Sequence, residues 1–227
     1  MDHSTVILPF MKTDLRDAEQ YIHNLIQSGE SQHLDFKFEI SNSKKIARTF
    51  SAFANTNGGK LLIGVKDNGK ISGIRSEEEA YMVESAAHLF CKPAVTYQIR
   101  KWWIKGRCVL EVDIPLSTKR PHYARDDDDR WVAFVRVSDQ NIRANSVLIG
   151  VWKKKGKKGI FINYGRPEKC LLDYLVNNES ITLSRFVKIA RINRSEAEKV
   201  LVNLILMHVI DLKITEKTVT YNIRQTG

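Results

Sequence analysis

The segment from Ser51 to Ile74, SAFANTNGGKLLIGVKDNGKISGI, constrains the fold most, because it specifies a helix end, a strand and a tight turn in direct succession. Gly58 and Gly59 follow a helical run and tolerate the positive φ angles that are typical of a helix C-terminus. The apolar stretch LLIGV predicts a buried strand, and Asn68-Gly69 predicts the two-residue turn of a hairpin. The segment therefore predicts a helix that leads directly into a β-hairpin.

Apolar spacing predicts the elements around this segment. Helical periodicity indicates helices over residues 14–27 and 43–55, whereas Leu34, Phe36 and Phe38 alternate with polar residues as in a strand. That alternation predicts a strand with one face open to solvent. Further helices and hairpins follow in mixed order, which indicates an α+β fold with a mixed or antiparallel sheet rather than a doubly wound sheet.

The hairpin segment resembles the AlbA-type nucleic-acid-binding domain of the Schlafen family, in which a phrase of the kind AFANT-x-GG, followed by a strand and GV-x-D, is typical. Upstream, Glu30–Lys37 (ESQHLDFK) is similar to the family's ES-x-x-x-EFK opening. Downstream, Arg120–Tyr123 and Phe134–Ser138 resemble its later strands. The resemblance covers roughly residues 14 to 150, about the size of one domain.

The resemblance also implies a candidate catalytic site. In Schlafen members that cleave RNA, three carboxylates lie at the positions of Glu30, Asp35 and Asp67, where they would hold Mg²⁺ or Mn²⁺ through oxygen ligands. Lys37 lies on the same strand face as Asp35 and is suited to stabilise an attacking oxygen. Asp35 departs from the family pattern, which more often has Glu. The alternative is an exposed strand face with solvated charges and an Asp67 that serves only its turn.

Gly58-Gly59-Lys60 superficially resembles a phosphate-binding loop. A Walker loop requires G-x-x-x-x-G-K-[ST] between a strand and a helix. Here Ala54 occupies the first glycine position and Leu61 the hydroxyl position, and the order is helix then strand. The sequence therefore argues against an ATPase.

The charge balance indicates the class of partner. Thirty-six Lys and Arg against 26 Asp and Glu give a formal charge of +10, which favours an anionic partner such as nucleic acid. No stretch approaches the roughly 20 apolar residues of a membrane-spanning helix, and no secretory signal is evident at the start, so we expect a cytoplasmic protein with no membrane partner. The three cysteines are widely spaced and indicate neither a disulfide framework nor a zinc site.

Composition divides the chain into an AlbA-type domain over residues 1–150, a basic linker over 151–165 and a second domain over 166–227. Three helices followed by a hairpin are predicted in the second domain, which is the pattern of a winged helix. We expect its third helix to begin at a Ser195 cap and to pack Ala197, Val200 and Leu201 inward. A helix over residues 145–152 is expected to close the first domain.

The leading hypothesis is a nucleic-acid-binding protein, a transcriptional regulator or defence factor, that grips DNA or RNA phosphates in a basic groove. The alternatives are a metal-dependent ribonuclease and a protein-interaction module that uses the winged helix. Because Schlafen cores resemble two such lobes, a homodimer is expected. The candidate contact residues are Lys44, Lys45, Arg48, Lys60, Arg136, Lys153, Lys154, Lys155, Lys157, Lys158, Arg194 and Lys199.

Two other features have structural interpretations. Asp126–Asp129 is a run of four carboxylates that indicates a solvated turn, neutralised by Arg125 and Arg130 or repelling nucleic acid from that edge. His122 lies in a matched segment, and we expect it to be a surface or hydrogen-bonded structural residue rather than a catalyst.

Overall fold

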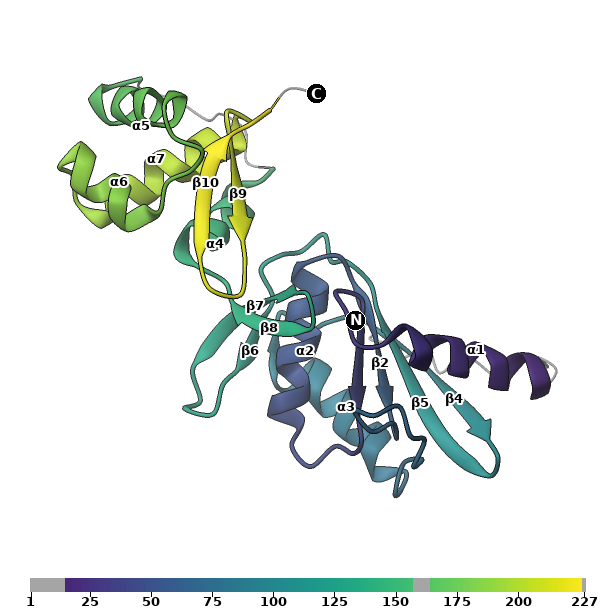
Figure 1. The fold of residues 1–227 in the computed structure, drawn as a ribbon. Helices are drawn as coiled ribbons and strands as arrows, with labels where there is room; N and C mark the ends of the chain where they lie inside the picture. Colours follow the sequence, from purple (N-terminus) through teal and green to yellow (C-terminus); the bar gives the residue numbers. More distant parts are fainter. Residues whose placement is uncertain (1–14, 157–163, 226–227) are drawn as a thin grey trace. The chain divides into compact units, whose positions relative to one another are not determined.

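The computed structural model describes residues 15–156 and 164–225, and it divides the chain into two compact units, Met1–Arg143 and Ala144–Gly227 (Figure 1). Both units contain helices and strands, which confirms the α+β class. No helix within the described ranges is both long enough and apolar enough to cross a bilayer.

The first unit contains two four-stranded sheets. The mixed sheet has the order β1-β2-β5-β4, in which β1 runs parallel to β2 and the other neighbours are antiparallel. The second sheet is antiparallel, in the order β3-β6-β7-β8. The strands are β1 Leu34–Lys37, β2 Gly59–Ile63, β3 Cys91–Lys92, β4 Gln98–Ile104, β5 Arg107–Ile114, β6 Tyr123–Arg125, β7 Trp131–Val137 and β8 Gln140–Arg143.

Three helices bury the faces of these sheets. On one face of the mixed sheet, Ile22 of α1 packs in a cluster with Phe36 and Leu62. On the other face, α2 and α3 form a larger core that also takes in Phe134 of the second sheet, so α2 lies between the two sheets (Figure 1). Residues Phe50–Asn55 of α2 are all buried in consequence. The helices are α1 Leu15–Ser28, α2 Ser43–Asn55 and α3 Glu78–His88.

The helix end, the buried strand and the turn of the central segment are confirmed, but the predicted hairpin is reduced to a single bridge between Val65 and Ile71. Helix α2 spans Ser43–Asn55 as expected, and the Gly58 amide donates to the Phe53 carbonyl at 2.9 Å. Gly58 has a φ of +71°, and a Cβ there would lie 2.8 Å from the Ile114 carbonyl oxygen, so only glycine fits this helix end. Beyond β2, Gly69 adopts a φ of +77° and closes the predicted turn.

The polar face of β1 is buried, which corrects the expectation of an open face. Asp35 is only 2% exposed, and the Thr49 hydroxyl of α2 donates to its carboxylate at 3.4 Å. Alternation shows which residues share a face but not whether another element covers it. Helix α2 covers this one, and Arg136 supplies the counter-charge.

The second unit has its own core, in which Phe186, Leu201 and Tyr221 are completely buried. Strands β9 and β10 pair as an antiparallel hairpin after three helices. The cap of α7 is Asn193, whose side chain accepts from the Glu196 amide at 2.9 Å, and not the expected Ser195. The elements are α4 Ser146–Lys154, α5 Arg166–Val176, α6 Leu183–Ala190, α7 Arg194–Leu206, β9 Ile210–Ile214 and β10 Val219–Ile223.

Helix α4 belongs to the second unit and does not close the first. Val147 lies in the core of the second unit, and the Asn145 amide donates to the Tyr221 hydroxyl at 3.1 Å. Gly150 approaches α7 closely, since a Cβ there would lie 2.8 Å from the Val202 side chain. The division therefore falls after Arg143, earlier than the expected boundary at residue 150.

Candidate nucleic-acid interface

Positive charge is concentrated in the second unit. Residues 144–227 carry 15 Lys and Arg against seven Asp and Glu, a formal charge of +8, whereas residues 1–143 carry 21 against 19, a formal charge of +2. Most of the chain's charge of +10 therefore lies on the smaller unit. An excess of this kind attracts polyanions to the surface that carries it.

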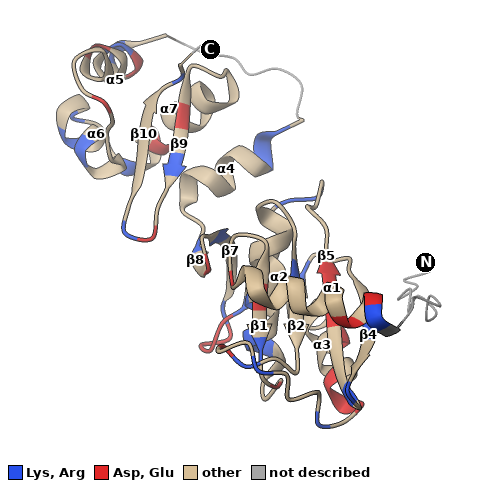
Figure 2. Cartoon of the chain, turned by 45° about the vertical axis from the view of Figure 1, so that its right-hand side comes forward, with Lys and Arg blue, Asp and Glu red and all other residues tan. Residues whose placement is uncertain are grey.

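Helix α4 brings together basic residues that the sequence places far apart. The Lys154 ammonium donates to the Asn203 side chain of α7 at 3.2 Å, and Lys199 lies one helical turn before Asn203 on the same side of α7. Lys153, Lys155 and Lys199 are exposed. We call the surface formed by Lys154, Lys199 and Asn203 the α4–α7 basic face; Figure 2 shows the basic residues of α4 in blue at the end of that helix. The predicted contacts Lys157 and Lys158 lie outside the described residues.

On the flank of α7 next to α4, Glu198 already has two partners. The Ser146 hydroxyl donates to Glu198 at 2.6 Å, and Arg194, another predicted contact, pairs with the same Glu198 carboxylate at 2.9 Å. Arg194 remains largely exposed despite this pair. Helix α6 and its C-cap add three further exposed cations, Arg185, Lys188 and Arg191.

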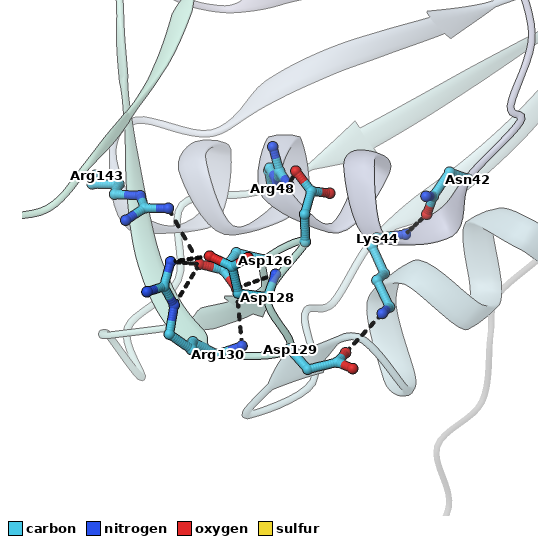
Figure 3. Close-up of polar contacts among 9 residues, drawn as sticks. Asn42, Lys44, Arg48, Asp126, Asp128, Asp129, Arg130 and Arg143 are labelled. Carbon is cyan, nitrogen blue, oxygen red and sulfur yellow. Dashed lines mark hydrogen bonds and ion pairs between the residues drawn. The ribbon is translucent and has the colours of Figure 1, made fainter.

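In the first unit, two predicted contacts pair with the acidic run. The Lys44 ammonium lies 2.7 Å from an Asp129 carboxylate oxygen (Figure 3). The Arg48 guanidinium lies 2.6 Å from Asp127. These partners lower the pKa values of the two aspartates: hydrogen bonding by Arg48 acts on Asp127, and that by Lys44 on Asp129. Lys45 is exposed.

Lys60 contributes to a buried polar network rather than to an open surface. Its ammonium lies 2.7 Å from Glu111 and 3.1 Å from Asp113. Burial alone would lower the pKa of Lys60, but these carboxylates raise it above its ordinary value. Glu111 is fully buried and also accepts from the Tyr21 hydroxyl at 2.8 Å and the Trp102 indole at 2.7 Å.

Arg136 is a structural residue, which corrects its prediction as a phosphate contact. It is 2% exposed, and its guanidinium donates to Asp35, to the Leu34 and Ser31 carbonyls and to the Asn141 side chain. All of these hydrogen bonds go to other residues of the same chain. A buried guanidinium with this many partners is unable to reach a phosphate in solvent.

Two of the three predicted carboxylates, Glu30 and Asp35, are neighbours, but Asp67 does not join them in one ligand group. Glu30 accepts from the Phe36 amide at 2.8 Å; its partial burial and the neighbouring Asp35 raise its pKa. Asp35 is paired with Arg136 at 3.2 Å and with Lys37 at 2.9 Å. Asp67 is exposed in the hairpin turn. The described residues, which include all three acids, hold no group of three His, Cys, Asp or Glu side chains arranged for a metal ion, so the proposed Mg²⁺ or Mn²⁺ site is not assembled.

Comparison with family models identifies the first unit. Residues 30–145 match the model described as Schlafen, AlbA_2, and this range is about half of the chain. The chain belongs to the Schlafen AlbA_2 family. This confirms the resemblance on which the expected fold rested.

Two solved structures are similar to this Schlafen AlbA_2 protein. The DIP2311 protein from Corynebacterium diphtheriae aligns with a TM-score of 0.46 and 17% identity, over 72% of this chain and 38% of its own. The N-terminal domain of a RecG-related protein from Nitrosomonas europaea aligns with a TM-score of 0.40 and 18% identity, over 65% of this chain and 96% of its own. No curated protein matches the chain.

The Schlafen-like AFANT phrase has a structural role that sequence analysis missed. The Asn55 amide donates to the His122 and Phe134 carbonyls at 2.8 and 2.9 Å, and its oxygen accepts from the His122 amide at 2.8 Å. The Ser51 hydroxyl also donates to His122, and the Thr56 hydroxyl accepts from the Arg136 amide. These side chains attach α2 to the second sheet. The small polar residues Ser51 and Asn55 within the buried, mostly apolar second half of α2 were the available signal.

Proposed function

We propose that this protein binds the phosphate backbone of nucleic acid and that the α4–α7 basic face is the principal contact. The supporting observation is the bond between Lys154 and Asn203, which puts Lys154 of α4 one helical turn from Lys199 in the unit that carries most of the positive charge. Each phosphate contact made by Lys or Arg releases condensed counterions, which contributes affinity without sequence specificity.

We also propose that the second unit is a winged helix. Helices α5, α6 and α7 are followed directly by the β9–β10 hairpin, and the Ile181–Tyr221 bridge ties the start of α6 to that hairpin. Helix α4 covers one flank of α7, and the exposed side keeps Glu196 beside Lys199. This mixed, partly covered face favours backbone contact over the reading of base edges in a major groove.

The proposal is tested by a salt series. Binding of a short fluorescent duplex, in DNA and RNA forms, is measured by anisotropy between about 50 and 200 mM salt, a range in which phosphate contacts are strongly screened. The Lys154→Gln/Lys199→Gln variant should bind more weakly, and the slope of log affinity against log salt should become shallower by about 0.9 per lost contact on a DNA duplex.

The matched control is Lys70→Gln/Lys119→Gln, which removes two exposed lysines of the first unit. It should leave the salt slope close to that of the unaltered protein, since neither lysine belongs to the α4–α7 basic face. If the control and the α4–α7 variant weaken binding equally, the face is not the principal contact. Binding that ignores salt would contradict the phosphate-contact proposal.

The metal site that the ribonuclease alternative requires is not supported by the described residues, because Glu30, Asp35 and Asp67 do not form one ligand group. The homodimer and the roles in transcription regulation or defence stay predictions.

A further inference from the structure

Two oppositely charged segments of the first unit face each other. The α2 basic face consists of Lys44, Lys45 and Arg48, and the acidic turn is Asp126–Asp129, between β6 and β7. Lys44 pairs with Asp129 at 2.7 Å (Figure 3), and Arg48 pairs with Asp127 at 2.6 Å. About 80 residues of sequence separate the two partners, so their contact is a product of the fold.

Asp126 has a structural role in the acidic turn, whereas Asp127 and Asp129 contact α2. Asp126 is 2% exposed and accepts from the Asp128 and Arg130 amides at 3.0 and 2.9 Å, with the Arg130 and Arg143 guanidinium groups also bound. The side chains of Asp127 and Asp129 are 67% and 60% exposed, and they are the ones that reach α2. Asp126 therefore shapes the turn, and the pairs with α2 are not needed for that shape.

The lysines of the α2 basic face occupy unfavourable positions on their helix. Lys44 and Lys45 lie in the first turn of α2, where the helix dipole disfavours cations, and this turn contains no acidic residue. The compensating carboxylates come from the acidic turn. Exposed pairs of this kind are individually weak and are screened by salt, so a competing anion can replace them.

We propose that the α2 basic face is a second contact surface for nucleic acid and that the acidic turn is a built-in competitor for it. Phosphates displace the Asp127 and Asp129 carboxylates, while Asp126 keeps the turn folded beside the opened surface. Guanidinium and ammonium groups bind phosphate with the same geometry that they use for carboxylate, and a polyanion delivers many phosphates at once. This inference rests on the proposed function and extends it to the first unit.

The test is a mutant cycle in the full chain, with a short labelled DNA duplex as the probe. Asp127→Asn/Asp129→Asn removes the competing carboxylates and leaves Asp126 in place. Binding should become tighter, and its salt slope should become steeper by about 0.9 for each phosphate contact that Lys44 or Arg48 gains. In a Lys44→Gln/Arg48→Gln background, the same two changes should produce no such gain.

Glu84→Gln/Asp139→Asn is the matched charge control. Both residues are exposed acids of the first unit. An equal gain in this control, or an equal gain in the Lys44→Gln/Arg48→Gln background, would show a general charge effect and overturn the inference. Unchanged binding of Asp127→Asn/Asp129→Asn would also overturn it.

These outcomes are separable from failure of the proposed function. If the unaltered protein binds the duplex and depends on Lys154 and Lys199 while the acidic turn has no effect, only the inference fails. If neither the unaltered protein nor the Asp127→Asn/Asp129→Asn variant binds, both fail. Far-UV circular dichroism and the urea midpoint of each variant confirm that the compared proteins are folded to the same extent.

Discussion

Replacement of Asn55 by alanine should destabilise the first unit severely. Asn55 is 1% exposed, and its side chain makes four hydrogen bonds at 2.8 to 3.2 Å, three of them to backbone groups of β7 and of the segment before β6. In Asn55→Ala the His122 carbonyl keeps the Ser51 hydroxyl, but the His122 amide and the Phe134 carbonyl lose the side-chain partner seen here. A buried polar group left without a partner costs about 1 to 3 kcal/mol, so two cost about 2 to 6 kcal/mol.

That loss is a large part of the total free energy of unfolding, because small domains are stable by only about 5 to 15 kcal/mol. Urea unfolding followed by tryptophan fluorescence measures it, since Trp102, Trp103 and Trp131 all lie in the first unit. With a slope of about 2 kcal/mol per molar urea, the midpoint should fall by about 1 to 3 M. The slope itself should stay nearly constant.

The control for this experiment is Asn57→Ala, two residues further along. Asn57 is exposed, so its replacement should change stability by no more than about 0.5 kcal/mol. Equal midpoints for the two variants would refute the argument that the amide of Asn55 attaches α2 to the second sheet.

Two other predictions concern the same core. Burial lowers the pKa of His122, whose ring forms hydrogen bonds with the Pro93 carbonyl and the Ser117 hydroxyl, so the unfolded chain takes up a proton at a higher pH than the folded chain. The stabilising contribution of His122 should therefore be full above a pH of about 6.5 and should decline as the pH falls below that value. The urea midpoints of the His122→Gln variant should lack this decline. Gly59→Ala would place a Cβ 2.5 Å from the buried Phe53 ring and should cost about 1 to 3 kcal/mol, whereas an unchanged melting temperature would contradict the packing argument.

Local chemistry accounts for what the sequence could predict. The end of α2 at Asn55, the glycines after it and the turn at Gly69 follow from backbone preferences that act within a few residues. The inward residues of α7, Ala197, Val200 and Leu201, follow from helical periodicity in the same way. Predictions of this kind need no knowledge of the rest of the chain.

The errors came from partners distant in sequence. Alternation placed Asp35 on a polar face, but it contained no sign that Arg136, 101 residues away, would bury that face. Lys44 and Arg48 stay predicted contacts, but the sequence did not show that they pair with acidic residues about 80 residues later. Complementary runs of opposite charge, KKxxR and DDDD, were visible in the sequence, although nothing local showed that they would meet.

The placement of α4 also decides where the second unit can be separated from the first. A fragment that begins at Arg166 would lack Asn145, whose side-chain amide donates to the Tyr221 hydroxyl, and Val147, which fills part of the core of the second unit. It would also uncover Val202, which is only 4% exposed while Gly150 lies against it. Expression of a stable isolated C-terminal half therefore calls for a cut at or before Ala144.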